Sequence, residues 1–294
     1  GRQYPSGKDG LVRAVNCHSS LRDIDRDSFP VVETLLTLSA SERIMTDRSL
    51  AELMFIQVLE NVRRRRYSDI EFDIVRDSMR LLREYVGIHR DSVEVLIEDG
   101  LVKIDTNRPH LIYSPTKRGR QLLSVRSREG DDFGEGIGDW QEENEHVFMV
   151  EIGKRYLEHA YADDDESPVR RILPYYEHED NVVDIVGVDS EGEVRIAVEA
   201  EQAANDRYES APADFDTIAD LEPDEALWIT PSRDEGHKIL QALSNPQDNN
   251  PRIEHDYTEG TRLHKRQFES RGLTDIVGMT YLRSRVMEFE SEEE

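Results

Sequence analysis

Cysteine is almost absent from this chain of 294 residues, in which Cys17 is the only one. A single thiol excludes an internal disulfide bond and a metal cluster held by several thiolates. Long apolar runs are missing as well, since no stretch approaches the ~20 residues needed to cross a bilayer and no leader-like segment opens the chain. These absences predict a soluble cytoplasmic protein without a membrane partner.

Lysine is also scarce, because only six of the 37 basic residues are Lys, against 63 acidic residues and a net charge of −26. Carboxylates hold hydration water where salt competes for it, and Arg is the better ion-pairing cation. Acid excess with Arg in place of Lys is typical of salt-adapted proteins of haloarchaeal type. The total charge then reflects the solvent rather than a binding partner.

The distribution of charge is therefore more informative than the sum. Residues 1–128 contain 22 basic and 19 acidic side chains, whereas residues 129–294 contain 15 and 44. A half that stays slightly basic indicates a phosphate-facing surface. Residues 124–138 are rich in glycine and charge, which is typical of a linker. The sequence predicts an arm (1–44), a first domain (45–126), a linker (127–138) and a second domain (139–294).

The first domain has helical apolar spacing followed by a hairpin pattern. Gly87 separates two of the expected helices, and a helix, a glycine turn and a second helix form the helix-turn-helix arrangement. A strand, a turn containing Pro109 and a returning strand follow. The expected helices cover residues 29–38, 50–62, 72–86, 89–98 and 115–123, and the expected strands cover 101–104 and 111–114.

The first domain contains the residues Glu98-Asp-Gly-Leu-Val102, the hairpin and the motif Tyr113-x-Pro-Thr-x-x-Gly. Through these features, residues 45–126 resemble the winged-helix domains of prokaryotic DNA-binding regulators. The resemblance implies that the helix at 89–98 enters the major groove of double-stranded DNA. Acids on that helix leave open a role in dimerisation or protein docking. The expected DNA contacts of this domain are Arg63, Arg64, Arg65, Arg66, His89, Arg90, Ser92, Lys103, Arg108, Lys117, Arg118 and Arg120.

The second domain alternates helical and extended patterns and predicts an α/β fold with a mixed sheet flanked by helices. Glycines at 134, 136 and 138 are read as linker, since no strand precedes them and no Lys follows, so no small-molecule cofactor is expected. The predicted helices cover 142–161, 213–221, 235–243 and 281–289, and the predicted strands cover 169–176, 182–188, 193–201, 226–230 and 274–279.

A carboxylate in the apolar strand 182–188 is the strongest chemical signal. Asp184 is costly there unless it is paired or binds a ligand. Glu199 and Glu201 share one face of the next strand, and a turn at 189–192 brings them beside Asp184. Three such carboxylates suit Mg²⁺ or Mn²⁺. Two alternatives remain: an ion pair of Asp184 with Arg195, and surface acids without a ligand. The histidines, including His146, show no metal-ligand spacing.

Residues 140–245 follow the order helix, strand, strand with Asp, strand with Glu-x-Glu, helix and strand. This order resembles the PD-(D/E)xK nuclease superfamily, which has a restriction-endonuclease-like fold. The resemblance implies metal-assisted phosphodiester hydrolysis, with Asp184 and Glu199 holding the metal and Glu201 orienting or deprotonating the water. It also implies an acid from the first helix, for which Glu145 is chosen. Glu201 departs from the usual Lys, and Pro does not precede the Asp. Gln202 and Arg207 are expected to contact DNA.

The sequence thus predicts a DNA-binding protein with a Mg²⁺-dependent or Mn²⁺-dependent endonuclease domain. The alternative is a winged-helix regulator or replication-associated factor whose inert nuclease fold serves dimerisation or docking. A protein-interaction module without nucleic acid is a third reading. Homodimer formation is plausible in each case, since both kinds of domain commonly pair.

Overall fold

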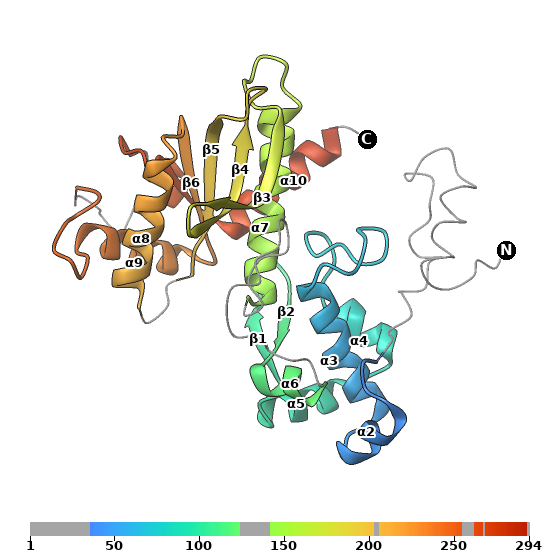
Figure 1. Cartoon of the computed structure of the whole chain (residues 1–294). Coiled ribbons are helices and arrows are strands. Elements are labelled where there is room, and N and C mark those ends of the chain that lie inside the picture. The colour runs from blue at the N-terminus through green and yellow to red at the C-terminus, as the bar shows by residue number, and fades with distance from the viewer. Residues whose placement is uncertain (1–35, 124–141, 203–205, 255–261, 267, 293–294) are drawn as a thin grey trace. The chain divides into compact units, whose positions relative to one another are not determined.

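The computed structural model describes residues 36–123, 142–202, 206–254, 262–266 and 268–292, and its chain divides into two compact units (Figure 1). The first unit comprises residues 1–131 and 143–145, and the second comprises residues 132–142 and 146–294. The predicted linker and most of the predicted arm lie outside the described residues. The expected mixed α/β class is confirmed. No described helix is long and apolar enough to cross a membrane.

Helices and one hairpin build the first unit. Serines begin two of its helices with capping boxes, in which Ser39 pairs with Glu42 and Ser49 with Glu52. Gly87 ends a helix in the left-handed conformation at φ 67°. Glycine adopts this conformation readily because it has no side chain, and the predicted end of the helix is confirmed. The elements are α2 (Ala40–Met45), α3 (Leu50–Arg63), α4 (Arg80–Val86), α5 (Arg90–Glu98), β1 (Val102–Thr106), β2 (Ile112–Pro115) and α6 (Lys117–Leu122).

The predicted helix over residues 72–86 is wrong in its first half, because only α4 is helical. Asp73 accepts a hydrogen bond from the backbone N–H of Val75 at 2.9 Å, and Asp77 accepts one from the backbone N–H of Asp73 at 2.8 Å. Such local side-chain bonds give the backbone an alternative to the helix. Periodic apolar spacing alone did not reveal that competition.

The second unit holds a five-stranded sheet in the order β3-β4-β5-β6-β7. The first three strands are antiparallel, and β5, β6 and β7 run parallel to one another. The elements are α7 (Asn144–Leu157), a π-helical turn (Glu158–Ala162), β3 (Arg171–His178), β4 (Asn181–Val188), β5 (Val194–Ala200), α8 (Arg207–Asp220), β6 (Glu225–Thr230), α9 (Arg233–Ser244), η4 (Leu263–Lys265), β7 (Asp275–Gly278) and α10 (Met279–Glu292).

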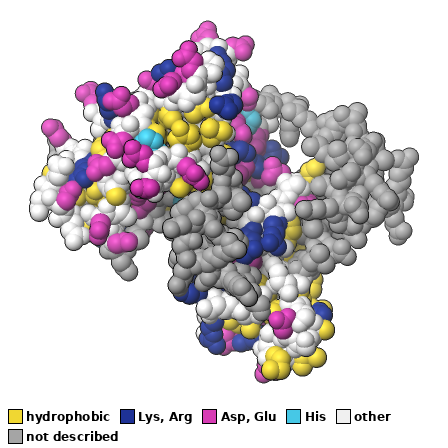
Figure 2. Space-filling view, viewed as in Figure 1, with side chains coloured by type: hydrophobic (Ala, Val, Ile, Leu, Met, Phe, Trp, Pro, Cys, Tyr) yellow, Lys and Arg dark blue, Asp and Glu magenta, His cyan; other side chains and the backbone are white. Residues whose placement is uncertain are grey.

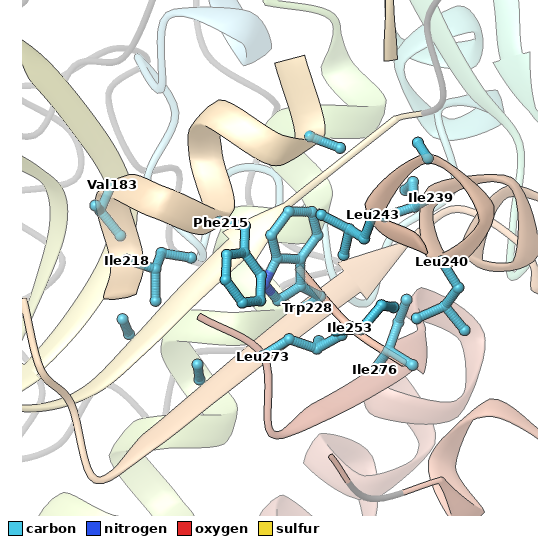
Figure 3. Packing of buried hydrophobic residues seen from close by; sticks show 14 of the residues in the cluster. Val183, Phe215, Ile218, Trp228, Ile239, Leu240, Leu243, Ile253, Leu273 and Ile276 are labelled. Carbon is cyan, nitrogen blue, oxygen red and sulfur yellow. The ribbon is translucent and has the colours of Figure 1, made fainter. Parts of the chain in front are cut away.

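Helices cover both faces of this sheet. A Cβ added to Gly153 of α7 would lie 2.7 Å from side-chain atoms of Ile185 and Ile229, so α7 packs closely on that face. Neighbouring strand residues point to the opposite face, where Trp228 and Phe215 join a buried cluster with α8 and α9 (Figure 3). Acidic side chains are spread over the visible surface of this unit (Figure 2).

The parallel strands β5, β6 and β7 end at one edge of the sheet. The register pairs Ala200 with Ile229 and Thr230 with Gly278. The backbone N–H of Glu201 continues the ladder with a 2.9 Å bond to the carbonyl of Ile229. Side chains at these three strand ends therefore share one edge, which is called the carboxyl edge below.

A candidate metal centre

Asp184 is the buried centre of an acidic cluster in the second unit. It is 7% exposed, and its Oδ2 accepts a 2.8 Å hydrogen bond from the backbone N–H of Ala200. Its Oδ1 lies 3.1 Å from Nε2 of His146. The alternative pairing with Arg195 is wrong, because that guanidinium donates to Asp189 at 2.7 Å.

The β4–β5 register brings the predicted acids together. Ile185 pairs with Val198, so the next position places Asp184 opposite Glu199, where side chains of neighbouring strands lie close. Glu201 follows two residues later on the same face, and Asp214 joins them from α8. The ligand-type oxygens of Glu199, Glu201 and Asp214 lie within 4.8 Å of one another. Glu199 and Glu201 therefore come together as the sequence predicts, whereas Asp184 lies opposite Glu199 and belongs to another ligand group.

A second group contains Asp184 together with residues before and within α7. Glu142, His146 and Asp184 place one ligand-type atom each within 4.8 Å of the others. Tyr175 donates its hydroxyl hydrogen to Glu142 at 2.9 Å. A cavity of about 250 Å³ is lined by Glu142, Tyr175, Asp184, Glu199 and Asp214 among others. The two groups thus border a space large enough for ions and water.

Burial and mutual repulsion shift the titration of these carboxyl groups. Burial, followed by the negative charge of Asp184, raises the pKa of Glu199 well above its ordinary value. Burial and the charge of Asp214 do the same to the pKa of Glu201. Burial and the charge of Asp184 raise the pKa of Asp214 to about 7. A site that pushes several acids toward their neutral forms is deficient in positive charge.

His146 supplies a positive charge to the cluster. Burial alone lowers the pKa of this imidazole, but the charges of Asp184, Glu142 and Glu201 and the hydrogen bond to Asp184 outweigh it and raise the pKa to about 9. One imidazolium beside five carboxyl groups leaves an excess of negative charge. A divalent cation would neutralise that excess directly.

The backbone is strained at the position that faces Asp184. The β3–β4 register pairs Pro174 with Ile185 and Tyr176 with Val183, which places Tyr175 opposite Asp184. Tyr175 adopts a left-handed φ of 53°, an uncommon conformation for a bulky residue. Such strain often accompanies functional sites, and here it positions the hydroxyl that holds Glu142.

Glu199 shows that the residues fit a cation. Its side chain is about nine-tenths buried and lines the cavity. Among the described residues, no N–H donor reaches this carboxylate, and its polar neighbour is another acid, Asp184. A buried carboxylate without a donor is costly. Carboxylate oxygens suit Mg²⁺ and Mn²⁺.

Two of the arginines expected to hold phosphates are used inside the first unit. Arg63 is 5% exposed and donates from Nε and from a terminal nitrogen to Glu60, at 2.9 and 2.8 Å. Arg64 donates to the same carboxylate at 2.5 Å. Arg66 donates to Asn61 at 3.5 Å. For Arg63 the expectation of a phosphate contact is wrong, because the helix that carries the run buries its first arginine against Glu60.

The other expected DNA contacts of the first unit are more accessible. Arg90 and Arg108 are exposed, the former in an ion pair with Glu94. His89 occupies the N-cap position of α5, and Ser92 follows in its first turn. Lys103 is paired with Glu143. Arg118 donates a hydrogen bond to the carbonyl of Asp99, and Arg120 donates one to the carbonyl of Pro115. Lys117 lies in α6, and Arg65 lies in the loop after α3.

In the second unit, the two predicted DNA contacts lie near the carboxyl edge. Gln202 follows Glu201 directly and is partly buried. Arg207 begins α8, with its guanidinium 4.8 Å from the centre of the Tyr208 ring. The predicted helix acid Glu145 groups by its contacts with the first unit and is not part of either ligand group. Glu142 and His146, on either side of it in the sequence, belong to the ligand group with Asp184 instead.

Sequence reasoning missed three members of the cluster. Glu142 and His146 are four residues apart, a spacing that places both on one side of a helical turn, and this signal was available in the sequence. Asp214 carried no comparable signal, because the expected helix began at residue 213 whereas α8 begins at Arg207. No protein-family model, curated protein or solved structure matches the chain. The geometry itself must therefore carry the functional argument.

Proposed function

We propose that the second unit is a divalent-metal-dependent phosphodiester hydrolase that acts on DNA. The observation that carries this proposal is the gathering of six ligand-type side chains in two groups, of which Glu142, Asp184, Glu199 and Asp214 line one cavity. Charge repulsion at this density is unfavourable without a cation. A structural role alone would not require five acids in one place.

The order of elements supports the same proposal. A helix, three antiparallel strands, a second helix and a parallel strand follow one another from α7 to β6. Asp184 lies in the second strand, and Glu199 and Glu201 lie at the end of the third. This is the arrangement that the resemblance to PD-(D/E)xK nucleases implies for those residues.

Each residue of the cluster has a separate role in the proposed hydrolysis. Asp184 and Glu199 would hold the cation, with Asp214 and Glu201 beside them. A bound divalent cation would supply positive charge to the phosphate and acidity to the attacking water. Glu201 would orient that water and accept its proton. His146 would fix the orientation of Asp184 through their 3.1 Å contact.

The first unit would contribute binding to double-stranded DNA. Its helices α4 and α5, the glycine turn between them and the β1–β2 hairpin follow the order of a winged helix. Arg90 and Arg108 are exposed on α5 and in the hairpin turn. In the Mg²⁺-dependent or Mn²⁺-dependent endonuclease proposed here, this unit recognises DNA and the second unit cuts it.

A cleavage assay tests the proposal directly. Purified protein is incubated with plasmid DNA in concentrated KCl with Mn²⁺, with Mg²⁺ or with a chelator. We expect cleavage with Mn²⁺, and a loss on the order of 10² to 10³-fold in Asp184→Asn and in Glu199→Gln. Glu191→Gln removes an exposed acid from the same hairpin and should cleave like the wild type. Full activity in Asp184→Asn would rule out this site.

A non-catalytic DNA-binding regulator is the second candidate. It is favoured by one observation: Glu201 occupies the place where the resembled nucleases carry Lys, which leaves His146 as the cation described within the cluster. Under this alternative, the protein protects a DNA site in footprinting and cleaves nothing with either metal ion. The plasmid assay therefore separates the two functions.

A further inference from the structure

A concentration of basic side chains stands out in the acidic second unit. The stretches 262–266 and 281–285 contain five Lys or Arg residues and no acid. They belong to η4 with its flanks and to the first turns of α10. In a half of the chain where acids outnumber basic residues by 44 to 15, such a stretch is unexpected.

Ring stacking joins these two stretches in space. The imidazole of His264 lies parallel to the ring of Tyr281, with centroids 4.2 Å apart and an interplanar angle of 6°. Tyr281 is 39% exposed, and the side chain of Arg285, one helical turn later, is 42% exposed and pairs with Glu288. Arg262 and Lys265 are exposed beside His264. We call these five residues the basic-aromatic patch.

The patch lies along the carboxyl edge that also carries Glu199 and Glu201. α10 begins directly after β7, whose end pairs with Thr230 at the end of β6. A Cβ on Gly236 would lie 2.6 Å from Leu263 and 3.1 Å from Thr230, which places η4 at the same edge. β5 and β7 are two strands apart, which corresponds to roughly 10 Å.

The chemistry of the patch matches a single strand of nucleic acid. Exposed guanidinium and ammonium groups attract phosphates, and an exposed aromatic face offers a stacking surface to an unpaired base. About 10 Å along a nucleic-acid strand corresponds to roughly three nucleotides. A strand held on the patch would reach the carboxylate cluster within a few nucleotides.

We infer that the basic-aromatic patch binds a single-stranded segment of nucleic acid and leads it toward the carboxylate cluster. This inference rests on the proposed function for its direction, but the binding surface itself is separate. If the patch has this function, the substrate of the proposed enzyme contains unpaired nucleotides near the cleaved bond. Tyr281 is a binding residue in this scheme rather than a catalytic one.

The test measures binding of a fluorescent single-stranded oligonucleotide by anisotropy across a KCl series, with full-length protein carrying Glu199→Gln to prevent cleavage. Adding Tyr281→Ala should weaken binding about 10-fold, since stacking contributes on that scale, and Tyr281→Phe should retain it. Arg262→Gln with Lys265→Gln should lower the slope of log affinity against log salt by about 1.4.

Matched variants provide the control. Arg271 and Lys238 are also exposed basic residues of the second unit, each paired with an acid, and replacing both by Gln should leave the salt slope unchanged. Wild-type affinity and slope in the patch variants, or an equal loss in the control pair, would overturn the inference. A loss confined to duplex binding or to binding of an acidic peptide would overturn its assignment to a single strand.

The outcomes for the two proposals are distinguishable. If the wild type cleaves no DNA and the patch variants still lose single-strand affinity, the hydrolase proposal fails and the binding surface stands. If the wild type cleaves DNA and the patch variants bind normally, the surface fails and the hydrolase stands. Circular dichroism of each variant confirms that the comparison is made between folded proteins.

Discussion

Each unit buries a glutamate, but the two glutamates have neighbours of opposite charge. Glu60 in the first unit is 1% exposed and receives hydrogen bonds from Arg63 and Arg64. Burial raises the pKa of Glu60, but the two guanidinium groups outweigh it and lower the pKa below the ordinary value. Glu199 in the second unit is 9% exposed and faces Asp184. The first glutamate is neutralised by two arginines of the chain, whereas the second lies beside another acid.

Removing the partner of Glu60 should produce the largest effect. Arg63→Ala leaves a buried carboxylate with only Arg64, and breaking such a pair costs about 3 to 5 kcal/mol of unfolding free energy. Urea denaturation followed by circular dichroism measures the loss. The control is Arg76→Ala, whose side chain is more exposed, and it should cost under about 1 kcal/mol. A similar small loss in Arg63→Ala would contradict the comparison.

Binding of the proposed divalent cation should stabilise the second unit. We expect Mn²⁺ to raise the unfolding free energy by about 2.7 kcal/mol at a concentration one hundred times its dissociation constant. Thermal unfolding with and without Mn²⁺ measures this change. Asp184→Asn should abolish the response, and its persistence in that variant would place the ion elsewhere.

The pH dependence of the metal-free protein should have a defined sign. The folded pKa of Asp214 is about 7 and that of His146 about 9, both above their ordinary values. The folded state therefore binds more protons than the unfolded state from about pH 4 to 9. Stability should fall as pH rises across this range, by about 1.4 kcal/mol per pH unit for each proton concerned. Denaturation at several pH values with a chelator measures the slope.

The control for this slope is Asp214→Asn, which should reduce the slope below pH 7, where Glu199 and Glu201 still contribute, and leave the part near pH 8 to His146. Stability that rises from pH 5 to 8 in the metal-free protein would contradict the raised pKa values of Asp214 and His146. Saturating Mn²⁺ should reduce the slope, because the ion and the protons compete for the same oxygens.

The smallest expected effect has the opposite sign to that of Arg63→Ala. Glu199→Gln removes one charge from a repelling pair and keeps the size of the side chain, so the metal-free protein should gain about 1 kcal/mol of stability. Glu60→Gln, the matched change in the first unit, should lose stability because it unpairs two arginines. If both substitutions destabilise equally, the two glutamates do not differ in the way proposed.

Much of the site followed from period-two alternation and from one turn. Asp184 amid Val and Ile, and Glu199 two residues before Glu201, are sufficient to predict convergence once the hairpin closes. Asp214 was not predictable, because it depends on how far α8 extends and how that helix packs on the sheet. Arg63 was misassigned for a related reason: burial of one side of α3 decides which of four consecutive arginines faces inward.

The sequence by itself determined the mixed α/β class, the acidic hairpin and the uneven distribution of charge, since these depend on local periodicity and composition. The tertiary structure alone decided which charges neutralise one another. In the folded chain, Glu142 and His146 lie close to Asp184, and Arg195 pairs with Asp189. The rings of His264 and Tyr281 stack. Electrostatic partners are set by distances of a few ångströms between segments far apart in the chain, and no local pattern encodes those distances.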